Sequence, residues 1–369
     1  MPAIRCASER DAMTAPLADL RPPGSGGVGE TVAASAAPPR LVDRFGRSIA
    51  YVRLSVTDRC NFRCVYCMAE KMTFLPHADV LRLEELDRLC AIFIGLGVKK
   101  IRLTGGEPLV RRGVMTLFQS LSRRLRSHAL EELTLTTNGS QLARYADALA
   151  ACGVKRVNVS LDTLDAATFS AISRRGSLSD VLAGVEAADR AGLRVKINAV
   201  AQKGLTEDCA VSLIRWAHGR GYDLAFIEVM PLGDVEREWP QRFLSLAELR
   251  ADLAARLTLA PTPYRSGGPA RYWRVEETGG RVGFITPMTH SFCDGCNRVR
   301  ITCSGRMVLC LGDEAAVDLG KILRESGDDR VVEAAIREAV ARKPKGHAFG
   351  SSEARASRAS VRPISLTGG

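Results

Sequence analysis

Residues 49–67 read IAYVRLSVTDRCNFRCVYC and place three cysteines shortly after a β-branched run. The run predicts a β-strand. Cys60, Cys64 and Cys67 follow it at the spacing C-x3-C-x2-C, close enough for three thiolates to bind one metal centre. Soft thiolate ligands select zinc, copper(I) or iron–sulfur clusters. A strand that leads into a metal-binding loop is therefore the first feature of the predicted fold.

The three cysteines are one ligand short of a structural zinc site, which takes four protein ligands. His77 is the nearest further candidate, and it lies well beyond Cys67. On a four-iron cluster, three cysteines leave one iron without a protein ligand, and that iron can bind a small molecule. The spacing therefore favours a reactive iron–sulfur cluster over a structural metal site.

The strand is the first of six β-branched runs that alternate with helical stretches rich in Ala and Leu. The runs are Ile49–Val56, Val98–Leu103, Leu133–Thr136, Val154–Leu161, Leu193–Val200 and Leu224–Val229, and the helical stretches are Arg82–Leu96, Gly113–Leu125, Gln141–Cys152, Ser179–Ala191 and Glu207–Arg220. Repeated βα units predict a parallel sheet with right-handed crossovers. Because eight units would close a full barrel, six predict an α/β fold with an open, partial (β/α)6 barrel of the TIM type.

Polar residues follow the predicted strands at the point where each one ends. They are Thr104–Pro108, Thr136–Gly139, Ser160–Asp162, Lys196, Asn198 and Glu228–Pro231. In barrels of this kind the chemistry lies at the carboxyl ends of the strands and in the loops after them. We expect these residues to meet the cysteine loop at one mouth.

Composition divides the chain into three parts. Residues 1–40 are rich in Ala, Pro and Gly, which predicts a disordered extension, and they lack the apolar core of a secretory signal. Residues 41–240 hold the βα units. Residues 241–369 carry a capped helix over Ser245–Leu257, a hairpin over Tyr272–Ile285 and a second group of cysteines, which predicts a smaller C-terminal domain.

The second group consists of Cys293, Cys296 and Cys310, and a turn at residues 304–306 would fold Cys310 back toward the other two. With Cys303 they match a four-thiol zinc ribbon, and spacing alone favours neither zinc nor a cluster. Arg298 and Arg300 alternate on a predicted strand and would point to the same side of it. Arginine side chains suit phosphates and carboxylates, so we expect an anionic substrate beside this metal.

Composition narrows the possible partners. The chain has 369 residues and a formal net charge of +11, which fits nucleic acid or a nucleotide phosphate as a partner. No apolar run approaches the ~20 residues that span a bilayer, so no membrane partner is expected. Eleven cysteines, mostly in two clusters, indicate metal ligands in a reducing, cytoplasmic location. No histidine stands near an Asp or Ser in a triad pattern.

Two features of the sequence resemble a known family. The C-x3-C-x2-C loop, with an aromatic residue before its last cysteine, resembles the signature of the radical S-adenosylmethionine superfamily. The longer strings over residues 51–64 and 292–300, with the terminal Gly368-Gly369, resemble one family within it, the GTP 3′,8-cyclases (MoaA) of molybdenum cofactor biosynthesis. The resemblance runs from about residue 41 to the C-terminus and leaves only the N-terminal extension outside it.

The resemblance implies a lyase that converts GTP to (8S)-3′,8-cyclo-7,8-dihydroguanosine 5′-triphosphate through a 5′-deoxyadenosyl radical. It implies S-adenosylmethionine and two [4Fe–4S] clusters, one on Cys60, Cys64 and Cys67 and one on Cys293, Cys296 and Cys310. It assigns S-adenosylmethionine contacts to Tyr66, Gly106, Ser160 and Met230, and GTP contacts to Arg53, Arg102, Thr136, Lys196, Arg298, Val299 and Arg300. Gly368 and Gly369 would support catalysis from within the active site. The implied partners are an electron donor, the downstream pterin cyclase MoaC and a second copy of the chain, with no nucleic acid.

Two other hypotheses remain open at this stage. The first is a radical S-adenosylmethionine enzyme with an auxiliary cluster that modifies a peptide, although Arg298, Arg300 and the glycine tail speak against it. The second is a basic zinc- or cluster-containing protein that binds nucleic acid. Cys303 keeps the zinc hypothesis open, because it could supply a fourth thiol at the second site. On a cluster, that fourth thiol would occupy the iron that a substrate needs.

Overall fold

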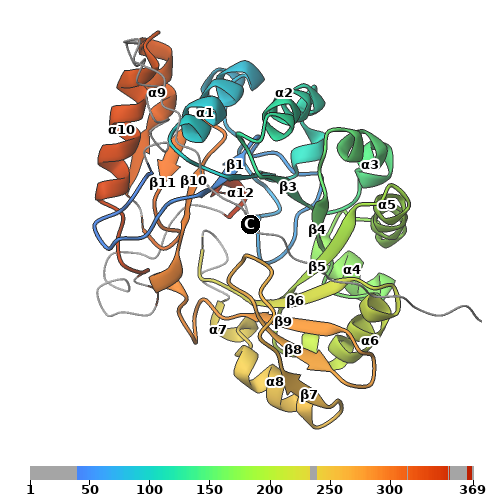
Figure 1. Cartoon of the computed structure of the whole chain (residues 1–369). Coiled ribbons are helices and arrows are strands. Elements are labelled where there is room, and N and C mark those ends of the chain that lie inside the picture. Colours follow the sequence, from blue (N-terminus) through green and yellow to red (C-terminus); the bar gives the residue numbers. More distant parts are fainter. Residues whose placement is uncertain (1–39, 233–238, 314, 348, 350–363, 368–369) are drawn as a thin grey trace, which may run out of the picture. The chain divides into compact units, whose positions relative to one another are not determined.

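The computed structural model describes residues 40–232, 239–313, 315–347, 349 and 364–367. Within these residues twelve strands form one open sheet in the order β12-β11-β10-β1-β2-β3-β4-β5-β6-β9-β8-β7 (Figure 1). The strands are β1 Tyr51–Ser55, β2 Lys100–Thr104, β3 Glu132–Thr137, β4 Arg156–Ser160, β5 Arg194–Ala201, β6 Asp223–Glu228, β7 Leu259–Pro261, β8 Arg271–Val275, β9 Arg281–Ile285, β10 Arg298–Ile301, β11 Arg306–Val308 and β12 Ala316–Asp318. The helices are α1 Leu83–Gly95, α2 Val114–Arg126, α3 Leu142–Ala151, α4 Ala166–Ser173, α5 Leu178–Arg190, α6 Thr206–Gly219, α7 Trp239–Arg242, α8 Leu246–Ala254, α9 Leu319–Glu325, α10 Asp329–Ala341 and α12 Ile364–Thr367.

The first six strands, β1 to β6, run parallel to one another, and helices connect them on the outside of the curved sheet (Figure 1). This confirms the α/β fold and the open partial barrel that the sequence pattern predicts. The pattern misses α4, because its eight residues are too few to show a clear period. Asp165 caps this helix by accepting a hydrogen bond from the backbone N–H of Thr168 at 2.7 Å. None of the described helices is both long and apolar enough to cross a membrane.

Strands from the C-terminal third of the chain extend both edges of the sheet. Strand β9 pairs in parallel with β6 at one edge, and β10 pairs in parallel with β1 at the other. Beyond them, β8 and β7 continue one edge and β11 and β12 the other, all in antiparallel pairs. The segment after residue 240 therefore completes the sheet of the βα units, and residues 38–369 form one compact unit.

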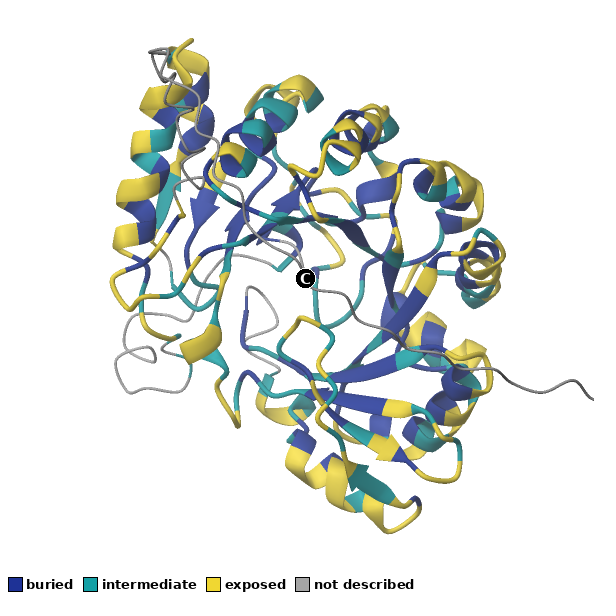
Figure 2. Cartoon of the chain, in the orientation of Figure 1, coloured by how far each residue is buried: buried dark blue, intermediate teal, exposed yellow. Residues whose placement is uncertain are grey.

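The core lies between the sheet and its outer helices (Figure 2). On β1, Val52 and Leu54 are each 1% exposed and belong to this core. The residues that alternate with them, Tyr51, Arg53 and Ser55, point to the inner side of the sheet, because successive strand residues face opposite ways. The same alternation on β10 buries Val299 in the core. The inner side of the curved sheet is thus left for polar and charged residues.

Candidate active site

A cavity of about 300 Å³ lies on the inner side of the sheet, and both groups of cysteines line it. Cys60, Cys64 and Cys67 come from the loop after β1. Cys293, Cys296 and Cys310 come from the loops around β10 and β11. The pairing of β10 with β1 brings the two groups together, although they lie far apart in the sequence.

The first cysteine loop is fixed by close packing against the loop after β2. The backbone N–H of Glu107 donates to the carbonyl oxygen of Arg59 at 2.8 Å. A Cβ atom on Gly106 would lie 2.3 Å from that same oxygen, so only glycine fits there. Gly106 therefore sets the distance between the β2 loop and the start of the cysteine loop.

The three thiols of this loop suit metal ligands. Burial raises the pKa of Cys60 to about 11 and that of Cys67 to about 12, and it also raises the pKa of Cys64 well above its usual value. At neutral pH such thiols stay protonated unless a metal supplies compensating charge. In the described part of the chain, no three His, Cys, Asp or Glu side chains converge on a single ion. A cluster does not require this, because each of its cysteines binds a different iron.

Tyr66, Gly106, Ser160 and Met230, the residues predicted to contact S-adenosylmethionine, all line the cavity. Tyr66 donates from its hydroxyl to the carboxylate of Asp162 at 2.8 Å, and the backbone N–H of Val200 donates to the same carboxylate at 2.8 Å. Burial raises the pKa of Asp162 to about 6. This carboxylate therefore holds the Tyr66 ring beside the cysteines.

Glu107 is a buried residue of the predicted polar stretch Thr104–Pro108, to which the sequence pattern gives no role of its own. Its carboxylate accepts hydrogen bonds from the backbone N–H groups of Leu109 (3.0 Å) and Asn138 (2.6 Å) and from the hydroxyl of Thr137 (2.8 Å). Burial raises its pKa to about 7. Glu107 thus ties the loop after β2 to the end of β3. Its position in the Gly-Gly-Glu-Pro stretch after a strand was the available signal.

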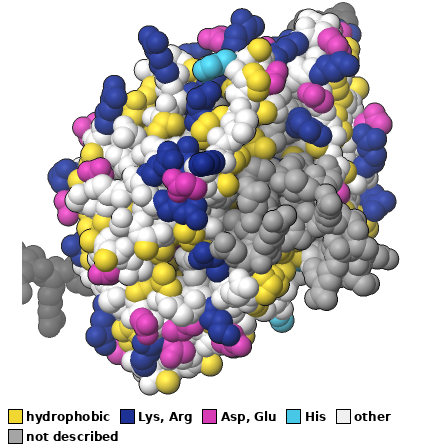
Figure 3. Space-filling model, turned by 180° about the vertical axis from the view of Figure 1, so that it is seen from behind, with side chains coloured by type: hydrophobic (Ala, Val, Ile, Leu, Met, Phe, Trp, Pro, Cys, Tyr) yellow, Lys and Arg dark blue, Asp and Glu magenta, His cyan; other side chains and the backbone are white. Residues whose placement is uncertain are grey.

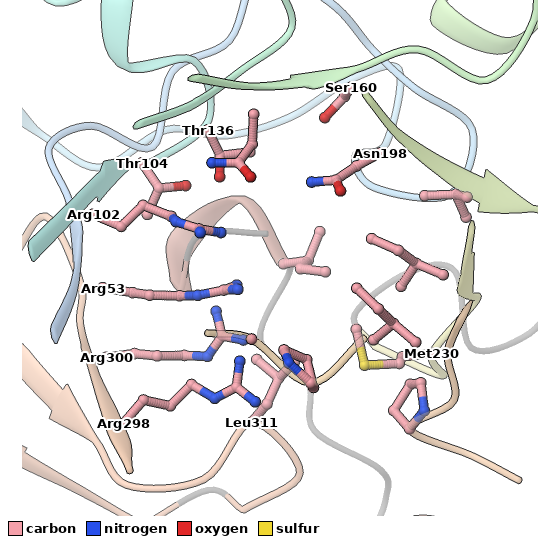
Figure 4. Close-up of a pocket in the computed structure, with 18 of the residues that line it drawn as sticks. Arg53, Arg102, Thr104, Thr136, Ser160, Asn198, Met230, Arg298, Arg300 and Leu311 are labelled. Atoms are coloured by element: carbon pink, nitrogen blue, oxygen red, sulfur yellow. The ribbon is translucent and has the colours of Figure 1, made fainter. Parts of the chain in front are cut away.

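Four arginines form a row along one wall of the cavity, which we call the arginine ladder (Figure 4). Arg53 on β1 lies in register with Arg102 on β2 and with Arg300 on β10. Arg298 precedes Arg300 by two residues and therefore lies on the same side of β10. The side chains of Arg102 and Arg300 are each only 9% exposed. The ladder concentrates positive charge where it is poorly screened by water.

Tyr51 lies among these cations, and the sequence pattern gives it no role of its own either. Its hydroxyl accepts a hydrogen bond from Nε of Arg53 at 3.1 Å, and the guanidinium of Arg102 lies 5.6 Å from its ring centre. Burial alone would raise the pKa of Tyr51, but the charges of Arg102, Arg53 and Lys100 lower it to about 7. The phenol therefore partly offsets the charge of the ladder.

Lys196 and several unpaired polar atoms complete the polar lining of the cavity. Lys196 donates to the hydroxyl of Tyr272 at 2.6 Å. Burial, with Coulombic repulsion from Arg102 and Arg156, lowers the pKa of Lys196 to about 7. Within the described residues, several buried atoms of the lining have no hydrogen-bond partner; they include Nε of Arg102, Nε of Arg156, Oγ1 of Thr136 and Oδ1 of Asn198. Because buried polar groups are normally paired, these atoms indicate a ligand-binding site.

The second cysteine group is anchored by a residue that precedes β1. Arg47 donates to the carbonyl oxygens of Cys293 (2.8 Å), Pro344 (2.6 Å) and Lys345 (2.7 Å). Its Nε also pairs with the buried carboxylate of Asp43 at 2.6 Å. Burial acts to raise the pKa of Cys296, but Lys343 and Arg298 outweigh it and lower that pKa.

Four residues that the sequence singles out need separate comment. Cys303 does not line the cavity; its side chain is fully buried, and the charges that act on it are those of Asp58 and Arg111. The side chain of Val299 is also fully buried in the core, so that only its backbone is available to a ligand. Gly368 and Gly369 lie outside the described residues.

Comparison with known proteins decides the family. The model of the radical SAM superfamily matches residues 54–217, and the Molybdenum Cofactor Synthesis C model matches residues 222–349. GTP 3′,8-cyclase of Brucella canis is 59% identical over 329 residues, which cover 89% of this chain and 96% of the relative. The relative named GTP 3′,8-cyclase from Brucella abortus strain S19 is 58% identical with the same coverage.

The chain belongs to the GTP 3′,8-cyclase family.

Family membership confirms the resemblance expected from the sequence. The chain is a radical S-adenosylmethionine lyase whose cofactors are S-adenosylmethionine and an iron–sulfur cluster. Among solved structures, Streptococcus suis SuiB bound to S-adenosylmethionine matches 84% of this chain and 76% of its own, with a TM-score of 0.56 and 15% identity. SuiB bound to its precursor peptide SuiA matches 86% and 70%, with a TM-score of 0.55 and 14% identity. At this identity the likeness shows a shared fold alone.

Proposed function

We propose that this chain is the enzyme that converts GTP to (8S)-3′,8-cyclo-7,8-dihydroguanosine 5′-triphosphate, the first step of molybdenum cofactor biosynthesis. One observation carries the proposal: the arginine ladder and both cysteine groups line the same cavity. A triphosphate bound to the ladder would extend its ribose and base toward the cysteines. The family of the chain supports the same substrate.

The residues around the first cysteine loop fit a [4Fe–4S] cluster and S-adenosylmethionine. Cys60, Cys64 and Cys67 would hold the cluster and leave one iron open for the cofactor. When bound, these groups supply the one-electron chemistry that produces a 5′-deoxyadenosyl radical. Tyr66, Gly106, Ser160 and Met230, which come from four separate segments of the cavity lining, would bind and orient the cofactor.

The protein itself binds and orients the substrate. Arg53, Arg102, Arg298 and Arg300 would bind the triphosphate, with Lys196, Thr136 and the backbone of Val299 as further contacts. Charge-assisted hydrogen bonds from arginine to phosphate are among the strongest in proteins. Exclusion of water by the buried part of the lining would protect a reactive radical. We propose that Gly368 and Gly369 enter this cavity, since glycine has no side chain to hinder it.

The second cysteine group is proposed to hold a second [4Fe–4S] cluster through Cys293, Cys296 and Cys310, whose open iron faces the guanine base. The position of Cys303 outside the cavity supports an open iron. The ten cysteines in the described residues are all free, which suits a cytoplasmic enzyme. We further propose that an external donor supplies the electron, that the chain forms a homodimer, and that the product passes to MoaC.

The distribution of charge favours a nucleotide over nucleic acid. Seven of the cationic side chains line the cavity; they are Arg53, Arg102, Arg156, Lys196, Arg298, Arg300 and Lys343. Glu228 is the one carboxylate in that described lining. On the face seen in Figure 3, Lys and Arg side chains are interspersed with Asp and Glu side chains. The internal cavity therefore accounts for much of the net charge of +11.

An anaerobic assay tests the proposal. The full chain is reconstituted with iron and sulfide and mixed with S-adenosylmethionine, dithionite and GTP. We expect 5′-deoxyadenosine and the cyclised nucleotide in equal amounts, and neither product without GTP. Intact clusters with no product from GTP would refute the proposal, and product from a peptide but not from GTP would support the peptide-modifying alternative.

A further inference from the structure

Lys343 is a buried lysine beside the second cysteine group. It lies just after α10 and lines the cavity, yet its side chain is only 2% exposed. Lysine is almost never fully buried unless its ammonium group is paired with an opposite charge. The surroundings of this ammonium group therefore indicate its role.

Among the described residues, Lys343 has a neutral acceptor but no anionic partner. Its Nζ donates to the carbonyl oxygen of Leu309, the residue immediately before Cys310. Within the described part of the chain, no carboxylate forms an ion pair with Lys343. An ammonium group has three N–H donors, and a buried charge without a counter-charge is costly. The folded protein thus carries this cost next to the second cysteine group.

Lys343 lines the same cavity as Cys293, Cys296 and Cys310. The carbonyl oxygen that its Nζ binds belongs to the residue directly before Cys310. A [4Fe–4S] cluster with three thiolate ligands is negatively charged in both of its common oxidation states. Such a cluster would supply the counter-charge that Lys343 does not find in the described part of the chain.

We propose that Lys343 is the internal counter-cation of the second cluster: its buried ammonium group offsets the negative charge of the cluster on Cys293, Cys296 and Cys310. This inference rests on the proposed function, which places a cluster there. The reduction potential of a cluster depends on nearby charge, hydrogen bonds and exposure to solvent. Lys343 consequently raises the reduction potential of this cluster and strengthens its binding.

The experiment uses the full chain with Cys60, Cys64 and Cys67 changed to alanine, so that all iron signals come from the second site. Lys343→Gln removes the charge and keeps a donor for the Leu309 carbonyl. Lys343→Arg keeps the charge. Lys345→Gln is the matched control, because Lys345 is exposed. Each protein is measured for iron content, for midpoint potential by electron paramagnetic resonance, and for thermal unfolding without iron.

We expect Lys343→Gln to lower the midpoint potential, or to lose iron, while the iron-free protein unfolds at no lower temperature than its parent. Lys343→Arg and Lys345→Gln should behave like the parent. An unchanged potential with full iron in Lys343→Gln would overturn the inference. So would a less stable iron-free Lys343→Gln, because it would show that Lys343 serves folding. A parent that binds no iron would instead overturn the second cluster itself, and the inference with it.

Discussion

Arg47 donates a hydrogen bond to the carbonyl oxygen of Cys293 at 2.8 Å, across 246 positions of the chain. Its guanidinium also binds the carbonyl oxygens of Pro344 and Lys345, and Asp43 holds it from the other side. A segment that precedes the first strand therefore positions both the second cysteine loop and the turn after Lys343. This one side chain connects the segment before β1 with the segments around Cys293 and Lys345.

Arg47→Met should destabilise the protein and empty the second metal site first. The change removes the ion pair of the buried Asp43 carboxylate, which keeps only the backbone N–H groups of Phe45 and Arg47. Breaking a buried ion pair costs about 3–5 kcal/mol of the free energy of unfolding. Urea unfolding measures the loss, and iron content in the Cys60, Cys64, Cys67 alanine background measures the site. Arg44→Met is the matched control, because Arg44 is exposed. Equal stability of the two variants would contradict the anchoring role.

Arg102→Met should weaken GTP binding about 10- to 100-fold, because a hydrogen bond to a charged group contributes about 1.5–3 kcal/mol. Calorimetry of GTP binding measures the effect, and GMP should show a smaller loss than GTP. Arg112→Met is the control, since Arg112 is exposed outside the cavity. If Arg102→Met weakens the binding of GTP and of GMP equally, the Arg102 side chain does not bind the β- and γ-phosphates.

GTP binding near pH 8 should take up protons. Lys196 and Tyr51 both have a pKa of about 7, so both have largely lost their proton at pH 8. A bound polyanion raises both pKa values, and proton uptake follows. Calorimetry in buffers of different ionisation enthalpy measures it. Lys196→Met and Tyr51→Phe should each reduce the uptake, and an unchanged uptake in both variants would refute the assignment.

The stability of the protein without ligand should also depend on Lys196. Its pKa is lowered from 10.5 to about 7 in the folded protein, so between these values the unfolded chain binds the extra proton. The contribution of Lys196 to the free energy of unfolding therefore rises as pH increases from about 7 to 10. Thermal unfolding of Lys196→Met should not show this rise in stability between about pH 7 and 10. The same pH dependence in variant and parent would exclude Lys196 as its source.

Gly106→Ala should damage the first metal site. The new Cβ would lie 2.3 Å from the carbonyl oxygen of Arg59, and overpacking of this kind costs about 1–3 kcal/mol. Iron content and S-adenosylmethionine binding measure the result. Gly95→Ala is the control, because a Cβ at Gly95 meets nothing within 4 Å. Normal cofactor binding by Gly106→Ala would show that the cysteine loop can move to accommodate the new Cβ, which would contradict the prediction.

Cys303→Ala should leave the iron content unchanged, whereas Cys310→Ala should lose the cluster of the second site, about four irons. Cys303 lies in the core, away from the cavity, and Cys310 lines it. Iron analysis of the two variants in the Cys60, Cys64, Cys67 alanine background decides between them. Loss of metal from Cys303→Ala would instead support the hypothesis of a four-thiol zinc site.

Much of this site could be predicted from local sequence. The β-branched runs, the helical stretches between them and the cysteine spacings each depend on a few neighbouring residues. Arg53 and Arg102 were assigned to GTP through the resemblance to the family, because an arginine on a strand can equally lie on a solvated edge. Tyr51 and Glu107 were given no role of their own. A tyrosine in a strand and a glutamate in a turn are ordinary until their surroundings are known.

The sequence by itself determined the order of the βα units, the two cysteine triplets and, through its resemblance, the family. Only the tertiary structure decided that β9 and β10 extend opposite edges of one sheet, that both triplets line one cavity, and that Cys303 does not line it. It also decided that Lys343 is buried beside Cys310. The physical reason is range: periodicity and ligand spacing are local, whereas strand pairing and the burial of a charge depend on contacts between distant segments.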